Sequence, residues 1–266
     1  EAARNLLDDG VLYVAQCKDD GRLIWLPLIH GEQGLNADNG FLSQADVLIE
    51  ARRAADVVGA TPMDRPEDID VSPISGRAYV MLTKNPKRSA SDLNAVNNRA
   101  DNHYGQILEL SPPDHDGAVD HAAAVFRWDI FLMAGDPDNP DHGAQYGTGL
   151  SREGVFSNPD NCAFDPQGRL WIGTDGAEDS LKTADGLWAC DTDGHARAVT
   201  KRFLRCPRGA ELCSPCFTPD GKTLFASIQH PGVGKGAHFD KPACRWPDFD
   251  EDVPPRPSVI VIEKED

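Results

Sequence analysis

The chain has 266 residues, of which 40% are hydrophobic, so it can bury a sizeable core. It carries 26 basic and 43 acidic residues, and the formal net charge of −17 argues against binding to a nucleic-acid backbone or an anionic membrane. The excess of carboxylates is compatible with calcium, which prefers oxygen ligands. No apolar run approaches the roughly 18 residues of a membrane span. We therefore expect no nucleic acid and no membrane as partner.

Short strand-like runs separated by tight turns follow one another along the chain. Five hairpins are predicted, at 11–28, 68–82, 162–174, 187–200 and 216–228. Single strands are predicted at 105–111, 124–133 and 258–263. Residues 43–59 form the one predicted helix, with Ser43 as its N-cap and Gly59 just beyond its end. Long loops rich in Asn, Asp, Gly and Pro are predicted at 84–104, 135–156 and 230–256.

Three of the predicted hairpins share a turn in which a proline is followed by a glycine, at Pro73, Pro166 and Pro219. The prolines are 93 and 53 residues apart, and a propeller blade takes roughly 40–50 residues, so the spacing predicts steps of two blades and one blade. We therefore expect an all-β fold, a β-propeller of about four blades with one inserted helix, as a single domain over residues 1–266. A sandwich of unrelated hairpins is the alternative.

Acidic residues recur at equivalent positions of this repeat. Glu67, Asp160 and Cys213 lie six residues before the three prolines, and Glu211 shares a strand face with Cys213 because side chains alternate along a strand. The first strand of each propeller blade lines the central channel, so the acids would converge on the axis. We therefore predict a site for hard cations formed by Glu67, Asp160 and Glu211. The alternative is that each acid caps a turn or pairs with a nearby Arg or Lys.

Arg65 stands two residues before Glu67, with Pro66 between them. Proline disfavours a helical conformation in the preceding residue, so Arg65 and Glu67 are expected on the same side of an extended segment. The planar guanidinium group matches a phosphate or a carboxylate. Arg65 could bind a phosphate group, or it could form an ion pair with Glu67 or Asp64, and the spacing leaves both open.

The seven cysteines are too few for a disulfide scaffold, and their number is odd. Cys213 and Cys216 form a single C-x-x-C pair without a second pair or a histidine pair at zinc-finger spacing, which favours buried or paired thiols over zinc. The sequence does not indicate which cysteines pair. His230 is interpreted as a structural residue or as support for a metal ligand.

Three segments carry a resemblance to a known family. Residues 59–73 (GATPMDRPEDIDVSP), 157–176 (SNPDNCAFDPQGRLWIGTDG) and 209–232 (GAELCSPCFTPDGKTLFASIQHPG) resemble the PhoX-type alkaline phosphatases. The similarity runs from about Leu6 to Glu263 and corresponds to the C-terminal portion of family members. It implies a periplasmic or secreted enzyme that hydrolyses phosphate monoesters. It also implies a six-bladed propeller, of which this chain forms part, with iron and calcium ions on its axis.

The resemblance further implies roles for individual residues. Arg65 matches the arginine that contacts the phosphate group in catalysis, Glu67 and Asp160 match metal ligands, and Glu211 in the GAE motif is also implied as a ligand. The N-terminal portion of family members supplies further ligands, among them a cysteine on iron, and this chain does not match that portion. We therefore expect an incomplete fragment of the active enzyme, without an initiator methionine or signal segment, whose substrate is a small phosphate ester. An open propeller edge would allow self-association.

Two other functions are compatible with the same residues. Calcium-dependent lactonases are propellers with Glu, Asp and Asn side chains around an axial calcium, and Glu67 and Asn161 could serve that chemistry. A phosphatase needs Arg65, whereas a lactone site does not. A calcium-stabilised propeller without catalytic activity would instead bind a partner through the loops 84–104 and 230–256.

Overall fold

The computed structural model describes residues 10–265, and the chain is mostly β-structure. It divides into two compact units. The first unit ends at Pro62 and also includes Ser111–Trp128, and the second comprises Met63–Leu110 and the residues from Asp129 onward. Strand β8 (Val125–Met133) belongs in part to each unit. Within residues 10–265, no helix has the length and apolar character needed to cross a membrane.

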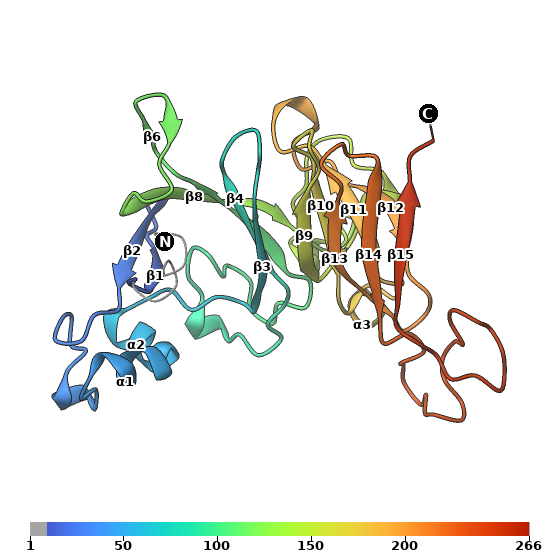
Figure 1. Ribbon diagram of the computed structural model, residues 1–266, viewed down its shortest axis with the longest axis horizontal. Helices are drawn as coiled ribbons and strands as arrows, with labels where there is room; N and C mark the ends of the chain where they lie inside the picture. Colours follow the sequence, from blue (N-terminus) through green and yellow to red (C-terminus); the bar gives the residue numbers. More distant parts are fainter. Residues whose placement is uncertain (1–9, 266) are drawn as a thin grey trace, which may run out of the picture. The chain divides into compact units, whose positions relative to one another are not determined.

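The first unit combines a β-hairpin with two short helices (Figure 1). β1 (Tyr13–Cys17) pairs antiparallel with β2 (Arg22–Pro27), which confirms the hairpin predicted at 11–28, and β2 pairs with the start of β8. Two very short strands, β6 (Asp114–His115) and β7 (Ala118–Val119), form a second ladder. The apolar core beside the helices consists of fully buried side chains, those of Leu28, Leu35, Phe41, Val47 and Ala54.

The helix predicted over 43–59 is in fact two helices, α1 (Gln44–Ile49) and α2 (Ala51–Val58). Both predicted caps are confirmed, because the Ser43 side chain caps the first turn of α1 and Gly59 ends α2 with a φ of 77°. The prediction of one continuous helix is wrong because Glu50, with φ −103° and ψ 39°, leaves the helical region between them.

The second unit holds three sets of antiparallel strands. The first set has β3 (Pro66–Val71), β4 (Ala78–Leu82) and β5 (Gln106–Ser111) side by side, with β8 next to β5. A four-stranded sheet contains β9 (Pro159–Phe164), β10 (Leu170–Thr174), β11 (Gly186–Cys190) and β12 (Lys201–Arg205). A three-stranded sheet contains β13 (Glu211–Phe217), β14 (Thr223–Gln229) and β15 (Ser258–Glu263). The short helix α3 (Ala177–Ser180) follows β10. Single 3-10 turns lie along the chain at Ala37–Asn39, Ala90–Asp92, Pro140–His142, Arg152–Gly154 and Gly194–Ala196.

The three hairpins of the predicted repeat are confirmed, since β3 pairs with β4, β9 with β10 and β13 with β14. The predicted single strands at 105–111, 124–133 and 258–263 correspond to β5, β8 and β15. The hairpin predicted at 187–200 is wrong in its second strand. β11 pairs with residues 201–205, because Gly194–Ala196 forms a 3-10 turn and delays the return strand.

The first strands of the three repeats lie next to one another, β3 beside β9 and β9 beside β13 (Figure 1). Side chains of one strand accept hydrogen bonds from the backbone of the next. Asp68 Oδ2 accepts from the Cys162 N–H at 2.9 Å, and Asn161 Oδ1 accepts from the Ser214 N–H at 3.0 Å. Asp68, Asn161 and Ser214 are equivalent positions of the sequence repeat, so the repeat is structural.

The contact between β3 and β9 shows that one predicted blade spacing is wrong. The spacing of 93 residues was expected to span two blades, but β3 and β9 are neighbours, so it corresponds to a single step. The extra length lies in the long loops 84–104 and 135–156 and in Ser111–Trp128, which belongs to the first unit. Of the sheets, β9–β12 has the four antiparallel strands of a propeller blade. Four blades and a single domain stay predictions.

A glycine directly before β5 gives a test of the packing in the second unit. Gly105 has a φ of 78°, and a Cβ atom there would lie 2.2 Å from the carbonyl oxygen of Thr83. Gly105→Ala is therefore expected to lower the free energy of unfolding by more than about 3 kcal/mol. Gly117→Ala is the control, because its φ is 80° but no atom lies within 4 Å, and its expected cost is about 1 kcal/mol. Similar losses in urea unfolding would contradict the steric argument.

Candidate functional site

Arg65 and Glu67 lie at the start of β3, in the second unit. The guanidinium group forms an ion pair with Glu67, with distances of 2.6 Å from Nη2 and 2.9 Å from Nε to Oε1. The two side chains are 49% and 32% exposed, so the pair itself contributes at most about 1 kcal/mol to stability. Arg65 has a φ of 50°, in the left-handed region that non-glycine residues rarely adopt and that is found preferentially at functional sites.

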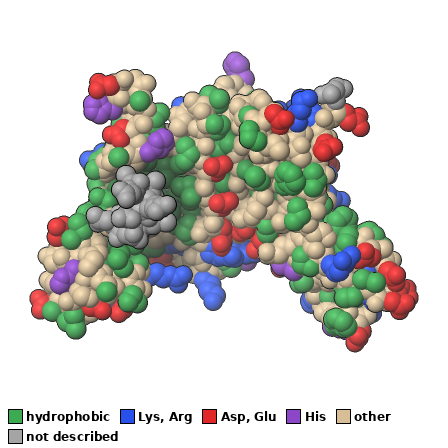
Figure 2. All heavy atoms as spheres, viewed as in Figure 1, with side chains coloured by type: hydrophobic (Ala, Val, Ile, Leu, Met, Phe, Trp, Pro, Cys, Tyr) green, Lys and Arg blue, Asp and Glu red, His purple; other side chains and the backbone are tan. Residues whose placement is uncertain are grey.

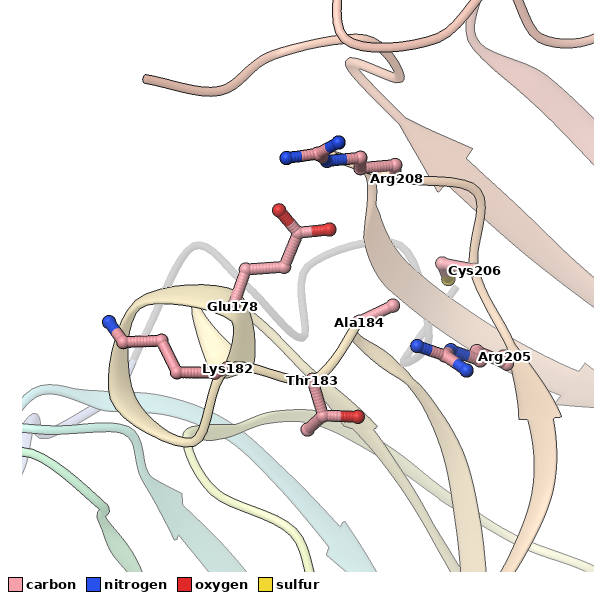
Figure 3. Close-up of a pocket in the computed structure, with 7 residues that line it drawn as sticks. All are labelled: Glu178, Lys182, Thr183, Ala184, Arg205, Cys206 and Arg208. Carbon is pink, nitrogen blue, oxygen red and sulfur yellow. The ribbon is translucent and has the colours of Figure 1, made fainter.

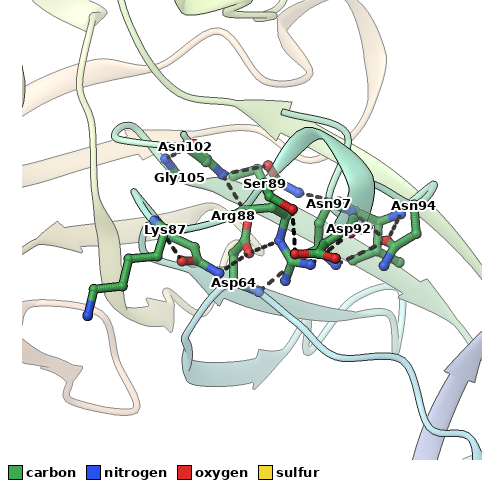
Figure 4. Close-up of polar contacts among 12 residues, drawn as sticks. Asp64, Lys87, Arg88, Ser89, Asp92, Asn94, Asn97, Asn102 and Gly105 are labelled. Carbon is green, nitrogen blue, oxygen red and sulfur yellow. Dashed lines mark hydrogen bonds and ion pairs between the residues drawn. The ribbon is translucent and has the colours of Figure 1, made fainter. Parts of the chain in front are cut away.

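Asp64, the other predicted partner of Arg65, is occupied elsewhere (Figure 4). Its fully buried carboxylate accepts hydrogen bonds from Arg88 Nε at 2.6 Å, Asn85 Nδ2 at 3.0 Å and Asn102 Nδ2 at 3.2 Å. An ion pair between Arg65 and Asp64 is therefore wrong. The three donors come from the long loop 84–104, which thus anchors the residue that precedes Arg65.

This buried pair gives a prediction for stability. Asp64→Ala is expected to lower the free energy of unfolding by about 3–5 kcal/mol, because it leaves the Arg88 side chain, only 8% exposed, without its carboxylate. Asp20→Ala is the matched control, since it removes the partner of Arg22 from an Arg–Asp pair that is half exposed, and its expected cost is below about 1 kcal/mol. Equal costs in urea unfolding would contradict the role of burial.

Asp160, on β9, is a buried carboxylate without a cationic partner. Thr83 Oγ1 donates a hydrogen bond to its Oδ1 at 3.1 Å, and it forms no ion pair with any residue in the described part of the chain. Burial raises the pKa of Asp160 to about 6, and repulsion from Asp175, Glu211 and Glu67 adds to the effect, whereas the hydrogen bond from Thr83 opposes it. The negative charge of Asp160 is therefore unfavourable in this fold.

Glu211, at the start of β13, accepts several hydrogen bonds. Its Oε2 atom is 2.8 Å from Gln229 Nε2 and 2.9 Å from His230 Nε2, and its Oε1 accepts from Cys213 Sγ at 3.0 Å. The last contact confirms that residues 211 and 213 share a strand face. Burial lowers the pKa of His230, but the hydrogen bond to Glu211 outweighs it and the pKa is raised. This supports the interpretation of His230 as a residue that holds Glu211.

Sequence reasoning missed two residues at this site, Asp175 and Lys84. Burial and repulsion from Glu211 raise the pKa of Asp175, whereas Lys84, Arg65 and His230 lower it. Lys84 Nζ lies 3.5 Å from the main-chain oxygen of Asp175. The relevant feature is strand pairing: Thr174 lies opposite Pro159, and the Asp175 N–H donates to the Asn158 carbonyl oxygen at 3.1 Å, so Asp175 lies at the end of the β9–β10 ladder where Asp160 also lies.

These interactions define an acidic cluster of four carboxylates, those of Glu67, Asp160, Asp175 and Glu211, with the basic side chains Arg65, Lys84 and His230 at its margin. Red acidic side chains follow the course of β3 in Figure 2. A cavity of about 140 Å³ adjoins the cluster, and its lining includes Asp175, Glu178, Asp185, Glu211 and His230. All four sequence-predicted residues, Arg65, Glu67, Asp160 and Glu211, therefore lie in one neighbourhood of the second unit.

Two of these carboxylates, Glu67 and Asp160, lie at shifts in the register of their strands. The register of β3 against β4 shifts between Pro66 and Asp68, at Glu67, and that of β9 against β10 shifts beside Asp160. Such bulges re-aim side chains and are frequent next to active sites. Because Glu67 and Asp160 are also equivalent in the repeat, β3 and β9 each present an acid at the same irregular position.

The donor chemistry of the cluster fits a hard cation, since all four side chains offer carboxylate oxygens and repel one another. The arrangement is not a complete coordination sphere. Within residues 10–265, no three His, Cys, Asp or Glu side chains are gathered in the geometry of a metal site. The residues thus fit as contributors to a cation site, and all seven cysteines are free thiols.

Comparisons with known proteins give consistent results. The family model of alkaline phosphatase PhoX matches residues 1–232. Among solved structures, the chain is similar to Pseudomonas fluorescens PhoX in complex with vanadate, a transition state analogue, with 38% identity and a TM-score of 0.85. The match covers 99% of this chain and 46% of that chain, so this chain spans about half the length of that relative. No match was found among curated proteins.

Proposed function

We infer that this chain, which belongs to the PhoX alkaline phosphatase family, forms part of an enzyme that hydrolyses phosphate monoesters. The observation that carries the inference is the position of Arg65, whose half-exposed guanidinium group lies at the margin of the acidic cluster. A similar Pseudomonas protein binds vanadate, a transition state analogue, which supports a phosphate ester as the substrate. A lactone site needs no guanidinium group, so under the lactonase-like alternative Arg65 would serve only its ion pair with Glu67.

Electrostatics supports a role for cations in this site. A phosphate dianion beside four carboxylates would be repelled unless positive charge lay between them, and Arg65 and Lys84 are cationic side chains at the cluster. We propose that Glu67, Asp160 and Glu211 are metal ligands, and that the ions are calcium and iron, as the family resemblance implies. When bound, such cations would offset the charge of the phosphoryl oxygens in the transition state.

Arg65 is proposed to bind and orient the substrate. Its guanidinium group can donate two parallel hydrogen bonds to phosphoryl oxygens, which adds specificity as well as affinity. The ion pair with Glu67 holds Nε and Nη2 in place, and the Asp64 network fixes the backbone just before Arg65. Gln229 and His230 hold the Glu211 carboxylate in the same way.

The resemblance also supports proposals about the whole protein. We propose that the sheets are blades of a propeller, which is six-bladed in the complete enzyme, and that the protein is periplasmic or secreted. β15 ends its sheet, with Val259 and Val261 exposed, so an open edge is available for self-association.

The test is the hydrolysis of 4-nitrophenyl phosphate by the protein in the length that its gene encodes, supplied with calcium and ferric iron. We expect turnover that EGTA abolishes and added calcium restores, and no hydrolysis of a simple lactone. The 266-residue chain alone is expected to show little turnover, because the resemblance implies ligands that it does not match. A folded, metal-loaded protein that leaves the phosphate ester intact would overturn the proposed function.

A further inference from the structure

A second pocket lies next to the acidic cluster, between the segment that contains α3 and the turn from β12 to β13 (Figure 3). Its volume is about 540 Å³. Arg205, at the end of β12, and Arg208, in the following turn, form one side, and Glu178 lies on the other. In Figure 3 both guanidinium groups extend toward the side of the pocket that Glu178 occupies, whereas Lys182 points outward.

No carboxylate in the described part of the chain neutralises these two arginines. Acids outnumber basic residues, and arginines such as Arg88, Arg169 and Arg197 pair with carboxylates. Within the described residues, the side chains of Arg205 and Arg208 form no ion pair and no hydrogen bond. Two unpaired guanidinium groups at one pocket repel each other and offer donors that match a phosphate or carboxylate group.

The carboxylate of Glu178 does not neutralise the arginines. Its Oε1 accepts a hydrogen bond from the Gly209 N–H at 3.0 Å, and it lies beyond ion-pair distance of both guanidinium groups. Lys182, whose Nζ donates to the Asp179 carbonyl oxygen at 2.5 Å, adds positive charge at the rim. The pocket therefore has excess positive charge in a chain that is otherwise strongly acidic.

The pocket adjoins the candidate site. Glu178 lines both this pocket and the smaller cavity that contains Asp175, Glu211 and His230. Arg208 precedes Glu211 by three residues, so their Cα atoms are at most about 10 Å apart. A phosphate ester bound at Arg65 and the acidic cluster could therefore extend its leaving group toward Arg208.

We propose that Arg205 and Arg208 form a subsite for a second anionic group on the leaving-group side of the substrate. The preferred substrates are then phosphate esters whose leaving group carries a carboxylate or a further phosphate. This inference rests on the proposed phosphatase function. It assigns to the two arginines a role in substrate choice, and none in the reaction at phosphorus.

The test compares three non-hydrolysable ligands of equal chain length by calorimetry. Hexylphosphonate has one anionic end, 6-phosphonohexanoate adds a carboxylate, and hexane-1,6-diyl bisphosphonate adds a second phosphonate. On the gene-encoded, metal-loaded protein, at least one of the two doubly anionic ligands is expected to bind about 10- to 100-fold tighter than hexylphosphonate. Which of them gains affinity identifies the second group as a carboxylate, a phosphate or either.

The variant R205Q/R208Q is expected to lose this preference, with unchanged affinity for hexylphosphonate and unchanged turnover of 4-nitrophenyl phosphate. R52Q/R127Q is the matched control, because it removes two exposed arginines from the first unit, and it should keep the preference. Equal affinities in the unaltered protein, a preference that survives in R205Q/R208Q, or the same loss in the control would each overturn the subsite. Failure of both hexylphosphonate binding and ester hydrolysis would instead overturn the proposed function, and the subsite with it.

Discussion

Asp160→Asn is expected to make the metal-free protein more stable and the enzyme much less active. Asp160 is a buried carboxylate among three other acids, and its one hydrogen bond, from Thr83 Oγ1, can be accepted equally by an asparagine oxygen. Removing the charge therefore relieves repulsion, and the Thr83 hydroxyl keeps its acceptor. Because the pKa of Asp160 is raised to about 6, the gain in unfolding free energy at pH 7 is expected to be roughly 3 kcal/mol.

The gain should depend on pH in a defined direction. The pKa of Asp160 is higher in the folded state, near 6, than in the unfolded state, near 4. The folded protein therefore loses stability as the pH rises between these two values. Below that window the carboxyl is protonated in both states, so the variant and the original protein should differ little. Urea unfolding at pH 4 and pH 7, with chelator present, measures the difference.

The activity of the Asp160→Asn variant should fall although its stability rises. If Asp160 is a metal ligand, its neutral replacement is expected to lower calcium affinity and kcat/KM for 4-nitrophenyl phosphate by at least about 100-fold. The matched control is Asp129→Asn, an exposed acid on β8 that accepts a hydrogen bond from the Ile130 N–H. A variant that is more stable but fully active would show that Asp160 is not a ligand.

Much of the site was predictable because it depends on a repeat in the sequence. The turn prolines Pro73, Pro166 and Pro219 set a common register, and that register places Glu67 and Asp160 at equivalent points of neighbouring strands. Strand periodicity likewise predicted that residues 211 and 213 share a face, and their side chains are in contact. Which residues share a strand face or an equivalent repeat position can be predicted directly from residue types and spacing. The roles of these residues in metal and substrate binding stay predictions.

Features that depend on long-range geometry were not predictable in this way. Asp175 and Lys84 reach the cluster through pairing between β9 and β10 and through a loop, neither of which a single segment specifies. The 93-residue step was misinterpreted because its loops are longer than an ordinary blade allows. The positive charge of the pocket at Arg205 and Arg208 depends on which arginines form ion pairs with acidic residues, and only the folded structure determines those pairs.

A charge exchange at Arg65 and Glu67 can separate a structural ion pair from a functional one. Arg65→Ala is expected to raise KM for 4-nitrophenyl phosphate by about 10- to 100-fold and to leave the metal content unchanged, because it removes charge-assisted hydrogen bonds to the phosphate group. Glu67→Gln is expected to lose metal and activity together. Both changes should alter stability by less than about 1 kcal/mol, since the pair is partly exposed.

The double variant R65E/E67R restores an ion pair with the charges exchanged. If the pair served stability alone, the exchange would rescue whatever the single variants lose. If Arg65 binds phosphate and Glu67 binds metal, stability should return while activity does not, because a carboxylate would then face the substrate and a guanidinium group the cations. D20R/R22E is the matched control, as Asp20 and Arg22 form an exposed ion pair with the same two-residue separation in the first unit, and it should retain full turnover. Recovery of activity in R65E/E67R would overturn the assignment of both residues.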